Sequence, residues 1–275
     1  MKILGVIPAR YASTRFLGKP LVDINGKSMI QCVYEQAKCC KSLARVVVAT
    51  DDERIFKHVE SFGGDVVMTA DTHQSGTDRC AEVVENVNFE IQSAFLNSND
   101  APVIGKITPR FEGIFTAVIN IQGDEPFIQP EQIEKIADIL RGGKSIATLA
   151  KRLTTQKDID NPNIVKVVFD AQGKALYFSR SPIPFIRHLD KKLWAKSGLF
   201  FKHIGLYGYK TSVLLDIARL APSNLEQTES LEQLRWLENG YDIGVIETDL
   251  ETIGIDTPED LKKIKKSPPT PKGGV

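Results

Sequence analysis

The segment with the most chemical potential is a basic loop at residues 8–21, which follows an apolar run. It reads Pro-Ala-Arg-Tyr-Ala-Ser-Thr-Arg-Phe-Leu-Gly-Lys-Pro-Leu, and its three cations are Arg10, Arg15 and Lys19. Guanidinium and ammonium groups separated by small residues can bind the oxygens of a polyphosphate. The loop has neither the glycine spacing of a Walker A motif nor that of the dinucleotide fingerprint. On spacing alone, phosphate binding and a solvated basic turn are equally open.

Two carboxylates in distant parts of the chain are candidate ligands for a metal ion. Asp124 lies in Gln-Gly-Asp-Glu-Pro at residues 122–126, after the apolar run 116–121, and Asp256 lies in Ile-Asp-Thr-Pro-Glu-Asp at residues 255–260. Mg²⁺ is often held by one or two carboxylates together with oxygens of a bound phosphate. Each aspartate could equally cap the turn or helix that follows it, and spacing does not decide between these roles.

Three further segments carry polar side chains at turns or on a strand. Residues 74–79, Gln-Ser-Gly-Thr-Asp-Arg, lead into a predicted helix whose N-terminus can receive an anion or a base edge, or is simply capped. Arg180 lies in a proline-rich loop, where a solvated arginine is the simpler interpretation. His203, Gly205 and Tyr207 share one face of a predicted strand, because side chains alternate along a strand. A single histidine on a strand is more often structural than functional.

The elements that must position these residues follow an alternating pattern of short apolar runs and helical stretches. We predict strands at residues 3–8, 45–50, 65–68, 116–121, 145–149, 164–169, 175–178, 203–209 and 241–248. Helices are predicted at 28–41, 53–62, 77–87 with Thr77 as its cap, 130–140, 225–239, and from Thr257 onward. This alternation predicts a doubly wound α/β fold with a mostly parallel sheet. Ligands of such folds bind beyond the carboxyl ends of the strands, where the basic loop and Asp124 lie.

Composition restricts the class of protein. The chain has 275 residues, 42% hydrophobic and 25% charged, as is usual for a soluble globular protein. Lys+Arg and Asp+Glu both number 35, so no overall field attracts nucleic acid or an anionic membrane. Apolar runs are far shorter than the ~20 residues of a membrane span. Four cysteines without a C-x-x-C pair, and an N-terminus that enters a strand at once, predict a cytoplasmic protein.

We expect one domain over residues 1–266. Residues 88–113 are largely polar and only weakly periodic, which predicts a surface insertion. The proline- and glycine-rich residues 267–275 predict a disordered tail.

Taken in order, these motifs resemble those of the 3-deoxy-D-manno-octulosonate (Kdo) cytidylyltransferases. The resemblance runs from Met1 to about Lys266, outside residues 88–113. It rests on nine segments, at residues 7–15, 18–21, 49–52, 75–79, 120–126, 178–180, 203–205, 231–235 and 256–261. Each is weak alone, but nine in the family's order are highly specific. Leu17 stands where the family commonly has Pro, and this departure affects no residue assigned to chemistry.

The resemblance implies a fold, a reaction and an assembly. The fold is a single three-layer α/β domain of the nucleotide-diphospho-sugar transferase type, with a mostly parallel central sheet, in a homodimer. The anomeric hydroxyl of Kdo attacks the α-phosphate of CTP, which releases diphosphate and gives CMP-Kdo for lipopolysaccharide synthesis. Mg²⁺ is the implied cofactor, and neither nucleic acid nor membrane insertion is expected.

The resemblance also implies a role for individual residues. The catalytic residues are Arg10, Lys19, Asp124 and Asp256, and the last two are the metal ligands. The nucleotide-binding residues are Ala9, Arg10, Arg15, Lys19, Gln74, Ser75, Gly76, Arg79 and Gln122, with Gln122 between the two substrates. The sugar-binding residues are Arg180, His203, Tyr207, Glu232 and Gln233.

Physical chemistry agrees with these implied roles. Transfer of a phosphoryl group needs in-line positioning and neutralisation of charge, which a metal ion and the basic loop supply. The carboxylate of Kdo suits Arg180. On the predicted helix 225–239, a shared polar face suits the sugar hydroxyls, and the leucines pack inward. The residues of that face are Glu229, Glu232, Gln233 and Trp236.

Three alternatives stay open. A cytidylyltransferase for another acid sugar, such as sialic acid or an 8-amino analogue of Kdo, would differ only around Arg180, His203 and Glu232. A nucleotide-sensing subunit without catalysis would not need the complete set of candidate catalytic residues. A glycosyltransferase would usually show a D-x-D metal pair, which residues 124–126 lack.

Overall fold

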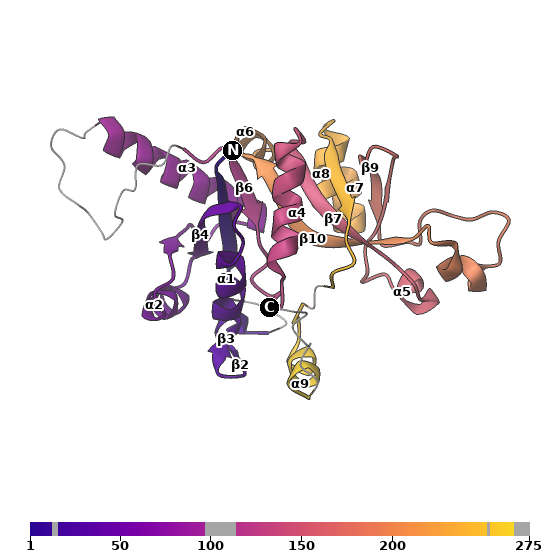
Figure 1. Ribbon diagram of the computed structural model, residues 1–275, viewed down its shortest axis with the longest axis horizontal. Coiled ribbons are helices and arrows are strands. Elements are labelled where there is room, and N and C mark those ends of the chain that lie inside the picture. Colours follow the sequence, from indigo (N-terminus) through magenta and orange to yellow (C-terminus); the bar gives the residue numbers. More distant parts are fainter. Residues whose placement is uncertain (13–15, 97–113, 252–253, 267–275) are drawn as a thin grey trace. The chain divides into compact units, whose positions relative to one another are not determined.

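The computed structural model describes residues 1–12, 16–96, 114–251 and 254–266 (Figure 1). Its contacts divide the chain into two compact units. Unit 1 comprises Met1–Pro130 with Ile253–Val275, and unit 2 comprises Glu131–Thr252. The N-terminal strand and the C-terminal helix therefore belong to the same unit.

Unit 1 contains a parallel sheet with the strand order β6–β1–β4–β5. Its strands are β1 (Ile3–Ala9), β4 (Leu43–Thr50), β5 (Val66–Met68) and β6 (Ala117–Asn120). The helices are α1 (Met29–Lys38), α2 (Glu53–Ser61), α3 (Gly76–Leu96) and α9 (Pro258–Lys266). The loop after β1 holds the short helix η1 (Lys19–Leu21) and leads into the hairpin β2 (Asp23–Ile24) and β3 (Lys27–Ser28).

The central strand β1 is buried on both faces. Leu4 and Val6 point to one face and Ile3 and Ile7 to the other, because side chains alternate along a strand. None of the four side chains is accessible to solvent. Both faces of this sheet are therefore covered, as in the predicted three-layer fold. Burying side chains of this size stabilises the unit by roughly 1.5–3 kcal/mol each.

Unit 2 is built around a mixed sheet with the strands β7 (Ile146–Arg152), β10 (Phe201–Lys210) and β11 (Ile243–Glu247). β7 pairs parallel with β11 and antiparallel with β10. The hairpin β8 (Lys166–Phe169) and β9 (Ala175–Ser179) joins β10 through β8. The helices are α4 (Pro130–Arg141), α5 (Gln156–Asp160), η2 (Lys191–Ser197), α6 (Thr211–Ile217), α7 (Asn224–Glu229) and α8 (Gln233–Glu238).

The structure confirms the predicted α/β fold and the strands predicted at 164–169 and 175–178, which pair with each other as the antiparallel hairpin β8–β9. Two helix predictions were wrong. The helix expected to end at Val87 continues to Leu96, because the side chain of Asn88 exchanges two hydrogen bonds with the backbone of Phe115. Residues 88–96 therefore belong to α3 and not to an irregular insertion. Residues 97–113 and 267–275, the rest of that segment and the tail, lie outside the described residues.

The second wrong prediction concerns residues 225–239, which form two short helices in place of one. α7 ends at Glu229, its C-cap Ser230 has a φ of +52° in the left-handed region, and α8 begins at Gln233.

Among the described helices α3 is the longest, at 21 residues, but it carries several charged side chains. In the parts of the chain that the structure describes, no helix is long and apolar enough to cross a membrane.

Candidate active site

The basic loop after β1 is folded back on itself. Gly18 donates its backbone N–H to the Tyr11 carbonyl at 3.0 Å and has a φ of +68°, which favours glycine. A Cβ atom at Gly18 would lie 3.2 Å from the Tyr11 ring. On its other side, this ring packs against the Arg54 guanidinium, 3.3 Å from the ring centroid. The fold of the loop places Lys19 at the start of η1.

Lys19 lies between the two candidate metal ligands. Its ammonium nitrogen is 2.7 Å from Asp124 Oδ2 and 3.2 Å from Asp256 Oδ1. The Lys19 side chain is 14% exposed and the carboxylates are 32% and 46% exposed, so one side of the cluster faces solvent. Both carboxylates therefore bond the same ammonium group, and part of each carboxylate remains exposed for binding a ligand.

Backbone contacts hold the two aspartates in place. Ile255 donates its N–H to the Asp124 carbonyl at 3.0 Å, which ties the segment before α9 to residues 122–126. A Cβ atom at Gly123 would lie 2.7 Å from the Pro8 carbonyl, so only glycine allows this approach to the end of β1. Thr257 accepts a hydrogen bond from the Asp260 N–H and so caps α9. The alternative role of Asp256 as the helix cap is therefore excluded.

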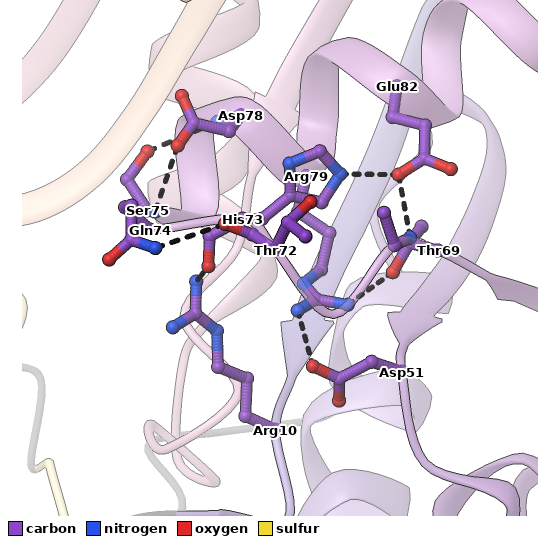
Figure 2. A network of polar contacts seen from close by, with 11 residues as sticks. Arg10, Asp51, Thr69, Thr72, His73, Gln74, Ser75, Asp78, Arg79 and Glu82 are labelled. Atoms are coloured by element: carbon purple, nitrogen blue, oxygen red, sulfur yellow. Dashed lines mark hydrogen bonds and ion pairs between the residues drawn. The ribbon is translucent and has the colours of Figure 1, made fainter.

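A polar network next to the start of α3 connects Arg10 to the segment 69–76 (Figure 2). Arg10 donates through Nη2 to the His73 carbonyl, and the His73 ring is hydrogen-bonded to Glu82. Glu82 Oε2 also accepts from the Ala70 N–H at 3.0 Å. Residues 70–73, which lead into the candidate nucleotide segment 74–76, are thus held by a cation of the first loop and by one carboxylate of α3.

Arg79 is fully buried in the same network. Its Nη2 donates to Asp51 Oδ2 at 2.9 Å, and its Nη1 donates to the Thr69 hydroxyl. A buried guanidinium that is paired in this way joins α3 to the end of β4. Its contacts in this structure are therefore those of a structural ion pair.

The other nucleotide candidates lie at the N-terminus of α3 and at strand ends. The Ser75 N–H donates to the Asp78 carboxylate at 3.0 Å, and the Asp78 N–H donates to the Ser75 hydroxyl at 3.1 Å. Ser75 therefore caps the helix, and the predicted cap Thr77 was wrong. Gln74 is exposed and donates to the Thr72 carbonyl at 3.1 Å. Ala9 ends β1, Gln122 follows β6, and Arg15 lies outside the described residues. A Cβ atom at Gly76 would lie 3.2 Å from Asn120 Nδ2, which requires a small residue there.

The Lys19 cluster has a donor set that fits Mg²⁺. Carboxylate oxygens are the hard ligands that this ion prefers, and it commonly takes its remaining ligands from water and substrate phosphate. No group of three or more His, Cys, Asp or Glu side chains that could hold a metal ion occurs among the described residues. A metal ion held by Asp124 and Asp256 would therefore need further ligands besides carboxylates of the described residues, such as water and substrate phosphate.

In unit 2, a bulge in β10 brings His203 and Tyr207 together. Ile204 pairs with Leu149 and Tyr207 with Thr148, so β10 holds two extra residues at this point. Residues four apart in a regular strand are about 13 Å apart, but the two rings are 5.3 Å apart. The predicted common face is confirmed, and the bulge explains the close contact. A Cβ atom at Gly205, within the bulge, would meet no described atom within 4 Å.

His203 is held as a neutral hydrogen-bonding group. Its Nε2 lies 3.0 Å from the hydroxyl of Thr148, which can donate its only hydrogen to the carbonyls of Ile204 and Leu206 at 2.9 and 3.0 Å. We assign the ring proton to Nε2 and the acceptor role to Nδ1, because the Thr148 hydroxyl has two carbonyl acceptors for its one hydrogen. Burial lowers the pKa of His203 to about 3. Burial also raises the pKa of Tyr207, with a smaller contribution from Glu232.

Arg180 is fixed by backbone carbonyls. Its Nε donates to the Glu229 carbonyl at 2.7 Å, and its Nη1 and Nη2 donate to the carbonyls of Pro162 and Ser230 at 3.2 Å. Three of its five N–H groups are used in this way. The described residues form no ion pair with this guanidinium, which remains partly exposed as a candidate for binding a carboxylate.

The remaining sugar candidates lie around the break between α7 and α8. Gln233 is buried and Glu232 partly exposed. Trp236, expected on the polar face with them, is buried and packs edge-on against Tyr207 with centroids 5.1 Å apart. The predicted common face of residues 229–236 was wrong, because the left-handed Ser230 ends the helical periodicity. Glu229 lies on α7, where it accepts from the Ser179 hydroxyl and from the Arg180 N–H.

Several partners of the predicted residues were missed from the sequence, namely Asp51, Thr69, His73, Glu82 and Thr148. Glu229 was expected on a polar face toward the sugar, and the structure shows it as the partner of Ser179 and Arg180. A carboxylate after the strand 45–50 is visible in the pattern, but nothing in the spacing assigns it to Arg79. Thr148 has no polar neighbour in sequence that would single it out, because its role depends on the bulge in another strand.

The sequence and the fold are similar to those of known proteins. The profile of the cytidylyltransferase family matches residues 4–243. The 3-deoxy-manno-octulosonate cytidylyltransferase of Cytophaga hutchinsonii is 49% identical over 265 residues, 96% of each chain. That of Parabacteroides distasonis is 51% identical over 268 residues, again 96% of each chain.

A solved structure of CMP:2-keto-3-deoxy-manno-octonic acid synthetase complexed with CTP is similar to this chain. The TM-score is 0.81 at 39% identity, over 97% of this chain and 98% of that one. The 4-diphosphocytidyl-2C-methyl-D-erythritol synthase of Anaerococcus prevotii, with a TM-score of 0.54 and 13% identity, shares the fold alone. By its sequence along nearly its whole length, this chain belongs to the 3-deoxy-manno-octulosonate cytidylyltransferases of the cytidylyltransferase family.

Proposed function

We propose that this protein transfers the cytidylyl group of CTP to Kdo and releases diphosphate. The observation that carries the proposal is the cluster of Lys19, Asp124 and Asp256, in which residues distant in sequence meet beyond the carboxyl end of β1. The relatives named above are Kdo cytidylyltransferases, and the solved relative is complexed with CTP.

In this proposal the residues of unit 1 bind the nucleotide. Arg10, Arg15 and Lys19 bind the triphosphate and neutralise the charge that develops on diphosphate as it leaves. The segment 74–76 and Gln122 contact the nucleotide, and Arg79 holds that segment through Asp51. Asp124 and Asp256 would hold Mg²⁺, which supplies Lewis-acid stabilisation of phosphate oxygens when bound.

The residues of unit 2 bind the acid sugar. The guanidinium of Arg180 pairs with its carboxylate, because two of its N–H groups are not used on the backbone. The neutral His203, with Nδ1 as acceptor, binds a sugar hydroxyl, together with Tyr207, Glu232 and Gln233. A neutral histidine is suited to hydroxyl groups and not to the carboxylate.

We further propose that the enzyme acts in the cytoplasm as a homodimer, and that its product serves lipopolysaccharide synthesis. The balanced charge of the chain and the absence of a membrane-spanning helix from the described residues are compatible with this setting.

A diphosphate-release assay tests the function directly. Purified protein with CTP, Kdo and Mg²⁺ is expected to release diphosphate and to form CMP-Kdo, with ATP and GTP as poor substitutes for CTP. The acid sugar is varied between Kdo, its 8-amino analogue and sialic acid, and the ratio of kcat/KM values identifies the substrate. CTP binding without product from any acid sugar would refute the proposal and favour a nucleotide-sensing subunit.

A further inference from the structure

Lys166, at the start of β8, is fully buried although its side chain carries a charge. Its ammonium donates to the backbone carbonyls of Ile164 and Arg180 at 2.6 Å and of Asn161 at 2.9 Å. The three N–H donors of an ammonium are thus matched by three acceptors from two separate segments. Lys166 holds the turn at residues 161–164 against the end of β9.

No carboxylate forms an ion pair with Lys166 within the described residues. The two acids that act on it through space, Asp160 and Glu229, are bonded elsewhere. Asp160 is paired with Lys191 at 2.8 Å, and Glu229 accepts from the Ser179 hydroxyl at 2.6 Å and the Arg180 N–H at 2.9 Å.

A buried ammonium without a carboxylate destabilises the fold relative to an apolar side chain of the same size. Burial accordingly lowers the pKa of Lys166. The fold is less stable with the buried ammonium of Lys166 than it would be with an apolar side chain there, which indicates a role for Lys166 beyond packing.

The environment of Lys166 overlaps that of Arg180. Lys166 binds the carbonyls of residues 161 and 164, and the Arg180 guanidinium binds the carbonyl of Pro162 between them. Lys166 also binds the carbonyl of Arg180 itself. The two cations are therefore linked through one turn and one peptide group, and movement of either would shift the other.

We propose that Lys166 is a positioning residue for the carboxylate of the acid sugar. It fixes the backbone from which Arg180 extends, and it adds a second positive charge next to that of Arg180. The added charge makes the potential around the guanidinium more positive, which favours an anionic over a neutral sugar. This inference rests on the proposed function. It adds a residue that the reaction requires but that does not contact the substrate.

The test replaces Lys166 with a neutral side chain of similar length, Lys166→Met, in the full chain. The KM for Kdo is expected to rise at least about tenfold, the effect of losing one well-placed charge-assisted contact. The KM for CTP is expected to stay within about twofold, because the candidate nucleotide residues belong to unit 1. Lys174→Met is the matched control, since Lys174 lies in the turn of the same hairpin and pairs with Asp242 near solvent.

A double-mutant cycle separates positioning from general destabilisation. If Lys166 acts through Arg180, Lys166→Met should raise the KM for Kdo much less in an Arg180→Ala background than in the wild type. Additive effects, an unchanged KM for Kdo, or equal increases in the KM for Kdo and CTP would each overturn the inference.

Two measurements keep the test decisive. If Lys166→Met does not fold, Lys166→Gln keeps two N–H donors for the carbonyls without the charge, and the same rise in the KM for Kdo is expected. Formation of CMP-Kdo by the wild type tests the proposed function separately. An active wild type with an unaffected Lys166→Gln variant would overturn this inference alone, whereas an inactive wild type would overturn both.

Discussion

Lys19 and Asp256 are 237 positions apart in the chain, yet the Lys19 ammonium nitrogen lies 3.2 Å from Asp256 Oδ1. The same nitrogen bonds Asp124 at 2.7 Å. A single lysine thus connects the first loop, the end of β6 and the segment before α9. A substitution of Lys19, Asp124 or Asp256 alters the same cluster of charges. Comparison of the three variants therefore separates the contribution of each residue.

The carboxylates of the cluster should be required for turnover and not for folding. Asp124→Asn and Asp256→Asn are each expected to lower kcat at least about 100-fold, similar to losing one group that stabilises the transition state. Chelation of divalent ions should abolish wild-type turnover, and added Mg²⁺ should restore it. Asp138→Asn, on the exposed side of α4, is the control. Full activity with reduced stability in Asp256→Asn would assign that residue to folding.

Lys19 should affect the nucleotide more than the sugar. We expect Lys19→Met to lower kcat/KM for CTP at least about tenfold, because a charge-assisted contact to phosphate is lost. The KM for Kdo should change little, and thermal unfolding should show that the protein folds. Lys27→Met, which removes an exposed lysine paired with Glu35, should leave both parameters unchanged. Wild-type kinetics in the Lys19→Met variant would show that the first loop is a solvated basic turn and does not bind the triphosphate.

Arg79 should be important mainly for stability. Arg79→Met leaves the carboxylate of Asp51 without its buried partner, and we expect the free energy of unfolding in urea to fall by roughly 3–5 kcal/mol. The pair of Arg54 and Asp52 is the comparison, because Arg54 is 59% exposed and such pairs contribute roughly 0–1 kcal/mol. Normal stability with lost CTP binding in Arg79→Met would make Arg79 a direct nucleotide contact.

The depressed pKa of His203 makes stability depend on pH. The folded state holds this ring neutral down to about pH 3, while the unfolded chain takes up a proton near pH 6.5. The stabilising effect is therefore complete above about pH 6.5 and is lost as the pH falls toward 3. Because the ring is partly exposed, we expect a loss of roughly 2–3 kcal/mol and not the full value of the shift.

The measurement is the free energy of unfolding at several pH values for wild type and His203→Asn. His203→Asn should flatten the curve between pH 7 and pH 4. Identical slopes for wild type and His203→Asn would show that His203 titrates normally.

Asn88 should stabilise the C-terminal half of α3. Asn88→Ala removes hydrogen bonds of 2.8 and 3.0 Å to the backbone of Phe115, and we expect a loss of about 1–3 kcal/mol. Asn86→Ala, at an exposed position of the same helix, is the control.

Replacing residues 97–113 with a short Gly/Ser link should leave both KM values within a few-fold, because no residue assigned to either substrate lies in that segment. A large rise in the KM for Kdo on that replacement would place part of the sugar site in the segment.

Local patterns predicted most of the elements but few of the side-chain partners. The run Arg45–Thr50 and the residues after it indicate a strand followed by a helix, because periodicity and capping act over a few residues. The break at Ser230 escaped prediction, because nothing in the residue type favours a left-handed conformation at a serine. The continuation of α3 past Val87 depends on a contact with Phe115, which no local pattern contains.

The site residues show the same division. Arg10, Lys19, Asp124 and Asp256 were found from their positions after apolar runs and from the family resemblance. Their contacts depend on the three-dimensional arrangement of strand ends. The bulge in β10 requires two extra residues relative to β7, and a sequence of alternating residues looks the same with or without it. Lys166 was missed because an isolated lysine at a strand start is ordinarily solvated.

The bulge at Gly205 leaves space in which the sequence of this enzyme can vary. Because an added Cβ meets no described atom within 4 Å and the backbone there has no positive φ, alanine or serine could be accepted without moving the strand. Such a side chain would occupy open space within the bulge. A single-codon change could therefore add a side chain to the segment between His203 and Tyr207, while the surrounding strands stay as they are.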